Sequence, residues 1–139
     1  MGKKKILIVE DDPDLLHSMH VRLRAHNYDT SSAEDAISCM AEARKIEPDL
    51  IILDLGLPAG DGFLLMDRFK KVPSLASVPV IVVSGRDIGE NQKKIVQSGA
   101  TAFLQKPVDN AMLLAVIRKA LGEQTSKEEP IVYNLGNPY

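Results

Sequence analysis

The sequence contains very little of several features that would assign it to a special class of protein. Its 139 residues include one cysteine, Cys39, which excludes an internal disulfide and favours a reducing compartment. The net charge of −2 gives no electrostatic reason to expect nucleic-acid binding. No apolar run is long enough for a membrane span, and Ile6–Val9 is too short for the core of a signal peptide. There is no internal repeat and no low-complexity segment. We therefore expect a cytoplasmic globular protein.

Apolar runs alternate along the chain with segments of helical periodicity, and short loops join them. A continuous apolar run such as 5–10 is typical of a strand that is buried on both faces. Asp12 followed by Pro13 is a typical helix start, and Gly99 and Gly122 are typical helix stops. The patterns predict strands over 5–10, 28–33, 49–55, 78–84 and 101–105, and helices over about 12–26, 36–47, 61–72, 87–98 and 109–121.

Five strands that alternate with five helices indicate an α/β fold, in which helices cover both faces of a parallel sheet. Strand 28–33 is polar and strand 101–105 is short, so both suit the edges of the sheet, whereas the other three suit its centre. Right-handed crossovers leave few topologies for such a chain. We predict a doubly wound five-stranded parallel sheet of flavodoxin-like order 2-1-3-4-5.

Polar side chains follow four of the predicted strands at the points where the strands end. Glu10 and Asp11 follow the first strand, Asp54 the third, Ser84 the fourth and Lys106 the fifth. The carboxyl ends of parallel strands share one edge of the sheet, so we expect these groups to meet there. Two carboxylates about 4 Å apart repel by roughly 4 kcal/mol at an effective dielectric constant near 20. A bound cation would relieve this repulsion, and an oxygen-only ligand set suits Mg²⁺.

The central carboxylate of this set has a possible chemical role. A carboxylate beside a divalent cation can attack phosphorus and form an acyl phosphate, which makes Asp54 a candidate phosphoacceptor. Lys106 would offset charge on the transferring group, and the Ser84 hydroxyl would donate to a phosphoryl oxygen. The turn "GLPAGDG" (56–62) lacks the Gly-Lys-Ser/Thr ending of a nucleotide-binding P-loop.

These residues carry a resemblance to a known family. The chain resembles a receiver domain of the two-component response regulator family from about Lys4 to Leu121. The resemblance rests on "VEDD" (9–12), "LDLGLPAGDG" (53–62), "VVSG" (82–85) and "QKP" (105–107), in the order and spacing of the family. Each motif is weak alone, but the four together at the ends of successive strands are specific.

The resemblance implies a chemistry for the site. Asp54 would accept a phosphoryl group from a sensor histidine kinase or a histidine phosphotransfer protein. Asp11 and Asp54 would bind Mg²⁺ directly, Glu10 through water, and the backbone carbonyl of Gly56 would be the third protein ligand. Self-directed phosphotransfer and dephosphorylation would be the only catalysis, so an enzyme acting on an external substrate is not expected.

The resemblance also implies how a signal would leave the domain. Ser84 and Lys106 would contact the phosphoryl group, and Phe103 aligns with an aromatic position whose rotamer follows the Ser or Thr. The fourth helix, fifth strand and fifth helix would report to a downstream protein target or an output domain, without direct contact to nucleic acid or membrane. The last helix lacks the Phe after Pro107 and the Arg pattern of DNA-binding regulators, so their dimer is not expected. A weak homodimer stays open.

Other interpretations stand beside this one. A receiver-like scaffold that is never phosphorylated would usually lack the aspartate, the lysine or the acidic pair, and all are present. A Mg²⁺-dependent phosphatase with an aspartate nucleophile usually places it after the first strand, whereas Asp54 follows the third. Asp12 is interpreted as a helix cap, and Gly56 as a position that affects acyl-phosphate lifetime. His17 and His20 are spaced to share a metal but are interpreted as exposed and unliganded.

The last residues fall outside the domain pattern. We expect a receiver domain over 1–122 and a flexible tail or the start of a linker over 123–139, because Pro, Gly and charged residues are frequent there. Within it, "IVY" (131–133) could add as a short strand or dock on a neighbour.

Overall fold

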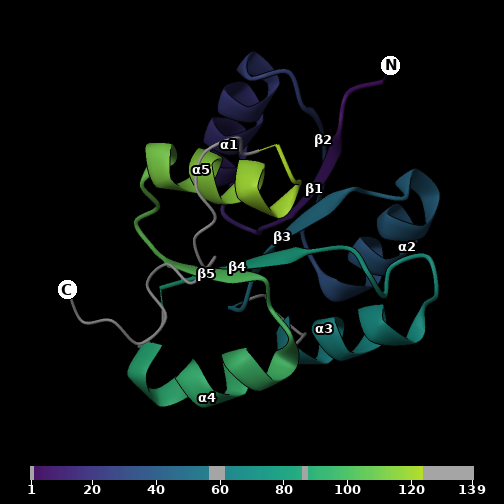
Figure 1. The fold of residues 1–139 in the computed structure, drawn as a ribbon, viewed down its shortest axis with the longest axis vertical. Coiled ribbons are helices and arrows are strands. Elements are labelled where there is room, and N and C mark those ends of the chain that lie inside the picture. The colour runs from purple at the N-terminus through teal and green to yellow at the C-terminus, as the bar shows by residue number, and fades with distance from the viewer. Residues whose placement is uncertain (1, 57–61, 86–87, 124–139) are drawn as a thin grey trace.

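The computed structural model describes residues 2–56, 62–85 and 88–123, with the side chains of helix α4 described from Lys93 onward. A single parallel sheet runs through it in the order β2-β1-β3-β4-β5, which confirms the predicted topology (Figure 1). The elements are β1 (Lys5–Val9), α1 (Pro13–Ala25), β2 (Asp29–Ala33), α2 (Ala36–Ile46), β3 (Leu50–Asp54), α3 (Gly62–Lys71), β4 (Val80–Ser84), α4 (Ile88–Ser98), β5 (Ala102–Gln105) and α5 (Asn110–Ala120).

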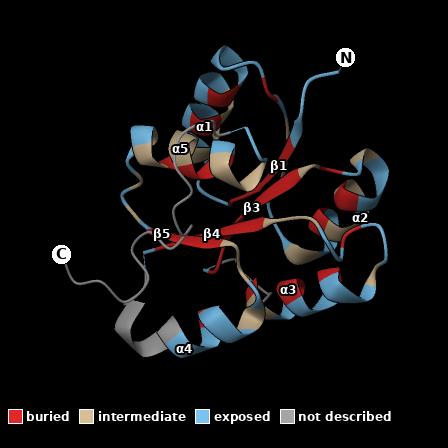
Figure 2. Ribbon diagram, viewed as in Figure 1, coloured by how far each residue is buried: buried red, intermediate tan, exposed pale blue. Residues whose placement is uncertain are grey.

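Helices cover both faces of the sheet and divide the core in two. Helices α1 and α5 lie on one face, and α2, α3 and α4 lie on the other (Figure 1). Side chains alternate along each strand, so Ile6 and Ile8 of β1 join the cluster beneath α1 and α5, whereas Leu7 and Val9 join the other. Strands β3 and β4 are buried over their whole length and β1 is buried after its exposed first residue, Lys5 (Figure 2), as their continuous apolar sequences predict.

The edge strand β2 differs from the strands beside it. Its sequence, DTSSA, has only Ala33 buried, yet it pairs with β1 from Lys5↔Asp29 to Val9↔Ala33. Strand β1, its one neighbour, pairs with half of the backbone N–H and C=O groups of β2. The other side of β2 is open, which explains the polar residues from which an edge strand was predicted. The predicted helix starts near Asp61 and Asp87 lie outside the described residues.

The start of α1 sets where the acidic pair lies. The Asp12 side chain accepts hydrogen bonds from the backbone N–H groups of Asp14, at 3.0 Å, and Leu15, at 3.4 Å. An N-cap of this kind stabilises a helix by about 1 kcal/mol, and Pro13 at the first position has no N–H that needs a partner. The cap holds the turn after β1 and leaves Glu10 and Asp11 at the edge of the sheet. Asp12 is therefore the predicted cap.

Helix α2 shows where a pattern can mislead. Its buried residues are Cys39 and Ala43, whereas Ile37, which fits the apolar repeat equally well, is 84% exposed. Burial raises the pKa of the Cys39 thiol to about 12, as expected for a small apolar core residue rather than a reactive thiol. Among the described residues, no helix has both the length and the apolar content that a membrane crossing needs.

Candidate functional site: an acidic cluster with one lysine

The carboxyl ends of the strands bring the predicted site residues together. Glu10 follows β1, Asp54 ends β3 and Ser84 ends β4, while Lys106 follows β5. Backbone hydrogen bonds set the positions of these residues relative to the neighbouring strands. The N–H of Glu10 donates to the carbonyl of Ala33 at 3.1 Å, and the N–H of Lys106 donates to the carbonyl of Ser84 at 2.8 Å. Their positions therefore follow from the ladder of the sheet.

Lys106 crosses this edge and contacts two acidic side chains. Its ammonium lies 2.9 Å from Glu10 Oε1 and donates a hydrogen bond of 3.2 Å to Asp54 Oδ2. The Lys106 side chain is 24% exposed and that of Glu10 is 1% exposed, so solvent screens these contacts only in part. Within the described residues, Lys106 contacts two of the three clustered carboxylates, so Glu10, Asp11 and Asp54 together with Lys106 carry an excess of negative charge.

The surroundings shift the pKa values of Glu10 and Lys106. Burial raises the pKa of the Glu10 carboxyl, and the charge of Asp54 adds to this, against contacts with Lys106 and the Asp12 N–H that lower it. Burial alone would lower the pKa of Lys106, but contact with Glu10 and the charge of Asp54 outweigh it and raise that pKa. Lys106 therefore stays charged across the neutral range.

The three acidic residues fit a small divalent cation. Glu10, Asp11 and Asp54 each offer an oxygen atom, and these atoms all lie within 4.8 Å of one another. The Oε1 atom of Glu10 is buried and lies 2.9 Å from the Lys106 ammonium. Asp11 is exposed and leaves one side of the cluster open to water. Hard oxygen donors with open positions are the ligand set that Mg²⁺ prefers.

Asp54 is held at both of its oxygen atoms. Oδ2 accepts from Lys106, and Oδ1 accepts a hydrogen bond of 2.9 Å from the N–H of Gly56. A Cβ on Gly56 would lie 3.5 Å from Asp54 Oδ1, an ordinary contact distance, so a small side chain would fit there. At Gly62 a Cβ would lie 2.9 Å from the backbone of Leu55. Glycine at the first residue of α3 is thus required by close packing against the end of β3.

Two other predicted residues are enclosed by the fold. Ser84 is 1% exposed, and its backbone carbonyl accepts the hydrogen bond from the Lys106 N–H. Phe103 is 1% exposed and packs in the core beneath α2, α3 and α4. Its place in the core agrees with ordinary packing, and a change of rotamer on activation stays a prediction.

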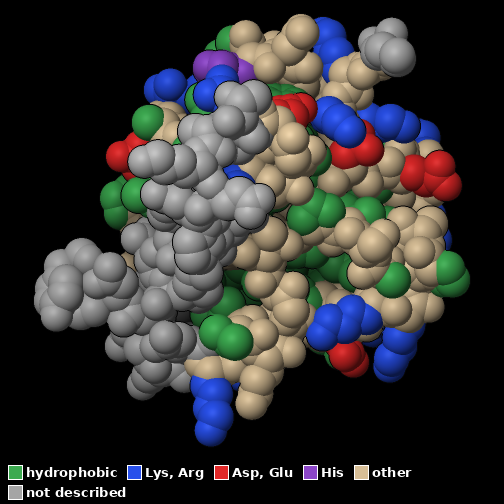
Figure 3. All heavy atoms as spheres, in the orientation of Figure 1, with side chains coloured by type: hydrophobic (Ala, Val, Ile, Leu, Met, Phe, Trp, Pro, Cys, Tyr) green, Lys and Arg blue, Asp and Glu red, His purple; other side chains and the backbone are tan. Residues whose placement is uncertain are grey.

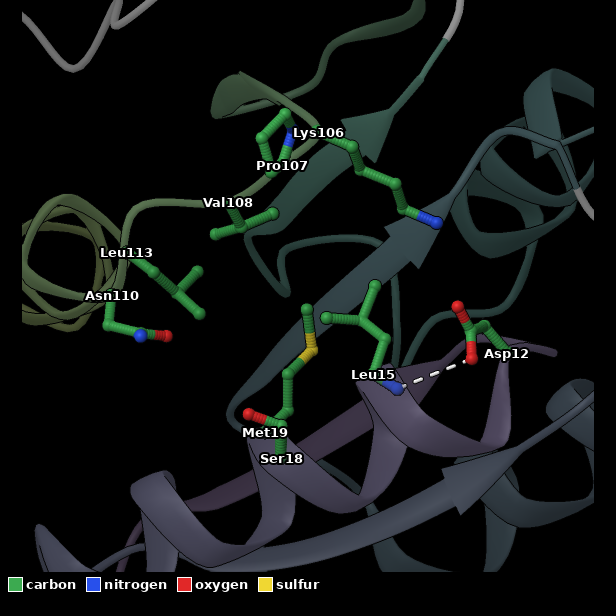
Figure 4. A pocket seen from close by; sticks show the side chains of 9 residues that line it. All are labelled: Asp12, Leu15, Ser18, Met19, Lys106, Pro107, Val108, Asn110 and Leu113. Atoms are coloured by element: carbon green, nitrogen blue, oxygen red, sulfur yellow. Dashed lines mark hydrogen bonds between the residues drawn. The ribbon is translucent and has the colours of Figure 1, made fainter.

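A groove beside the cluster was not predicted. It lies between α1 and the connection from β5 to α5, with a volume of about 490 Å³. In Figure 4, Leu15 and Met19 of α1 face Val108 and Leu113 across it, and Lys106 lies at its edge. The lining residues are about 90 positions apart in sequence, so no local pattern could reveal the groove.

One of the two histidines, His20, lies differently from the interpretation of the sequence, which placed both at the surface. His20 is half-buried, and its Nδ1 lies 2.6 Å from the hydroxyl of Thr30 on β2, to which Arg24 Nε donates at 2.7 Å. Burial lowers the pKa of His20, and the charge of Arg24 adds to this. His17 is exposed as expected. Thr30 holds His20 against the edge strand.

Comparison with known proteins agrees with this geometry. The response regulator receiver domain pattern matches residues 6–118, and the chain belongs to this family. It is 38% identical over 119 residues to the DNA-binding dual master transcriptional regulator RpaA of a Synechocystis strain, which covers 84% of this chain and 48% of RpaA. The chain therefore spans about half the length of this curated relative.

Solved structures share the fold. A response regulator receiver domain protein from Methanospirillum hungatei has a TM-score of 0.80 and 31% identity, covering 88% of this chain and 96% of that one. The receiver domain of a sensor histidine kinase from Pseudomonas aeruginosa, with a magnesium ion coordinated in its active-site cleft, also has a TM-score of 0.80, with 25% identity. That alignment covers 87% of this chain and 99% of the other.

Proposed function

We propose that this chain is a phosphorylation-dependent signalling switch in which Asp54 is the phosphoacceptor. The donor would be a phosphohistidine on a sensor histidine kinase or a histidine phosphotransfer protein. The observation that carries the proposal is the position of Asp54, whose Oδ2 lies 3.2 Å from Lys106 and whose oxygen atoms belong to the three-carboxylate cluster. A nucleophilic carboxylate, a fixed cation and a cation-binding cluster then lie within one small volume.

Each residue has a role in this reaction. An Asp54 oxygen forms a bond to phosphorus while the bond from phosphorus to the histidine nitrogen breaks, and the imidazole keeps that electron pair and takes up a proton. Glu10, Asp11, Asp54 and the carbonyl of Gly56 would hold Mg²⁺, which when bound neutralises charge on the phosphoryl oxygens. Lys106 would contact the phosphoryl group, and Ser84 would donate a hydrogen bond to it.

The signal would pass to other proteins through a change of surface. We infer a receiver domain over 1–122 whose reporting surface is α4, β5 and α5, acting on a downstream target or an output domain. The chain would act in the cytoplasm, with phosphotransfer to itself and dephosphorylation as its only catalysis. A receiver-like scaffold is the second candidate, but no observation favours it over phosphorylation.

The test is phosphorylation by a small acyl-phosphate donor in the presence of Mg²⁺, measured by intact mass. Wild type should gain one phosphoryl group, and a chelator should abolish the gain. Asp54→Asn should gain none, while Asp12→Asn, which keeps a good N-cap in the same motif, should behave as wild type. An unmodified wild type that still binds Mg²⁺ would support the scaffold, and release of phosphate from small phosphoesters would support a phosphatase.

A further inference from the structure

A groove between α2 and α3 leaves apolar surface open to water on the face of the sheet away from α1 and α5. It has a volume of about 560 Å³. Ile37, Met40 and Val72 contribute apolar side chains to it. Ile37 is 84% exposed, the largest exposed fraction of any large hydrophobic residue that the structure describes. Covering a side chain of this size is favourable, so the groove suits an apolar occupant.

The rest of the lining is basic. Arg44, Arg68 and Lys71 line the groove, and none of the described residues that line it is acidic. Lys71 lies 3.7 Å from Asp67, but within the described part of the chain neither Arg44 nor Arg68 belongs to an ion pair. Lys and Arg side chains are prominent over α3 at the lower right of Figure 3. An occupant should therefore join apolar side chains to acidic ones.

A series of contacts links the end of the described chain to the C-terminal end of α2, where Arg44 lies. Glu123 follows α5 and accepts a hydrogen bond of 2.8 Å from the Tyr28 hydroxyl, just before β2. Strand β2 pairs with β1 through Lys5↔Asp29, and the Lys5 ammonium donates to the carbonyl of Ile46 at the end of α2, at 3.0 Å. Neighbouring strands are about 5 Å apart. This series of contacts joins the end of α5 to the end of α2.

The chain continues after Glu123 with a segment of matching chemistry. Residues 128–133 read EEPIVY, two acidic residues followed by a proline and three large apolar residues. The five residues 124–128 can span about 17 Å when extended. A tethered segment also has an effective concentration on the order of millimolar, so weak contacts suffice for docking.

We propose that residues 128–133 dock in the groove between α2 and α3 of the same molecule. Glu128 and Glu129 would face Arg44 and Arg68, and the apolar residues that follow would cover Ile37. The proposal does not depend on phosphorylation of the domain. Docking in this groove would leave α4, β5 and α5 open to partners. It would also hold the segment after α5 on the face of the sheet opposite to α5.

Amide hydrogen exchange of the full chain, measured by NMR at Glu129 and at Ile131 to Tyr133, tests whether residues 128–133 dock in the groove. In wild type these amides should exchange about tenfold more slowly than their intrinsic rates, which corresponds to about 1.4 kcal/mol of docking free energy. Ile37→Asp should restore the intrinsic rates, and it is tolerated because Ile37 is exposed in the first turn of α2. Val21→Asp, at a site that is 55% exposed on α1, is the matched control and should leave protection unchanged.

A charge exchange tests the ionic contacts separately. Arg68→Glu should reduce the protection, and Glu129→Arg added to it should restore it. Intrinsic exchange rates in wild type, or equal losses with Ile37→Asp and Val21→Asp, would overturn the proposal. Protection that rises with protein concentration would also overturn it, because the occupied groove would then belong to a second copy.

Discussion

Replacing Lys106 by methionine should destabilise the protein without Mg²⁺ and much less with it. Lys106 is the cation that faces Glu10 and Asp54, at 2.9 Å and 3.2 Å. At an effective dielectric constant of 20 these attractions have upper bounds of about 5.7 and 5.2 kcal/mol. The cost of removing the ammonium from water opposes most of this, and the side chain is still 24% exposed. We therefore expect a net loss of about 2 kcal/mol in the free energy of unfolding, below the 3–5 kcal/mol of fully buried pairs.

The dependence on Mg²⁺ gives this prediction its specificity. Without Lys106 the three carboxylates repel one another more strongly, so a divalent cation should stabilise the variant more than it stabilises wild type. For a dissociation constant of about 1 mM, 10 mM Mg²⁺ adds about 1.4 kcal/mol to wild type, and tighter binding by the variant adds more.

Urea unfolding with a chelator and with 10 mM Mg²⁺, followed by circular dichroism, measures both effects. Lys71→Met is the matched control, because Lys71 is 76% exposed and its ion pair with Asp67 is worth less than about 1 kcal/mol. The reasoning is refuted if Lys106→Met is as stable as wild type in chelator, or if Mg²⁺ stabilises both proteins equally.

Three further predictions concern single residues. Gly62→Ala should lower the free energy of unfolding by about 2 kcal/mol, because its Cβ would overlap the backbone of Leu55, and denaturant unfolding would measure the loss. Gly56→Asn should change the lifetime of the acyl phosphate, because an amide side chain beside the acceptor can position or block water; decay followed by intact mass would show an unchanged lifetime if the idea is wrong. The pKa of His20 is lowered in the fold, so its stabilising contribution should be fully present above pH 6.5 and be lost as pH falls through the lowered pKa. A His20→Gln variant should show a flatter loss of stability between neutral and acidic pH, and an unchanged profile would exclude His20 as the source.

Much of the fold could be predicted because local and global signals agree. The strands β1, β3 and β4 are continuous apolar runs, and their burial on both faces is the reason that such runs persist. The N-cap Asp12 and the helix stop Gly99, which has a φ of +87°, each begin or end a helix through contacts with residues only a few positions away. Signals of this short range can be interpreted without knowledge of the tertiary structure.

The acidic edge was also predictable, for a topological reason. Once the strands are known to be parallel, the residues after them must share one edge, and Glu10, Asp54 and Lys106 do so. The contact distances were not predictable, because they depend on side-chain rotamers and on hydrogen bonds such as that from the Gly56 N–H to Asp54. Periodicity gives the edge on which a group lies but not the partner it contacts.

Features built from distant segments could not be predicted. The groove beside Lys106 joins α1 to the start of α5, and the contact between His20 and Thr30 joins α1 to β2. The exposure of Ile37 follows from the way α2 packs, because Cys39 and Ala43 face the sheet and direct Ile37 outward. Each of these depends on a helix rotation or crossing that side-chain packing determines.

The central claim is that Asp54 carries the phosphoryl group, and chemical trapping tests it most directly. The protein would be treated with an acyl-phosphate donor and Mg²⁺, reduced with borohydride, digested and mapped by peptide mass spectrometry. Reduction converts an aspartyl phosphate to homoserine, so the account predicts homoserine at position 54 and at no other aspartate. Homoserine at Asp11 or Asp12, or a phosphorylated protein without homoserine at position 54, would contradict it.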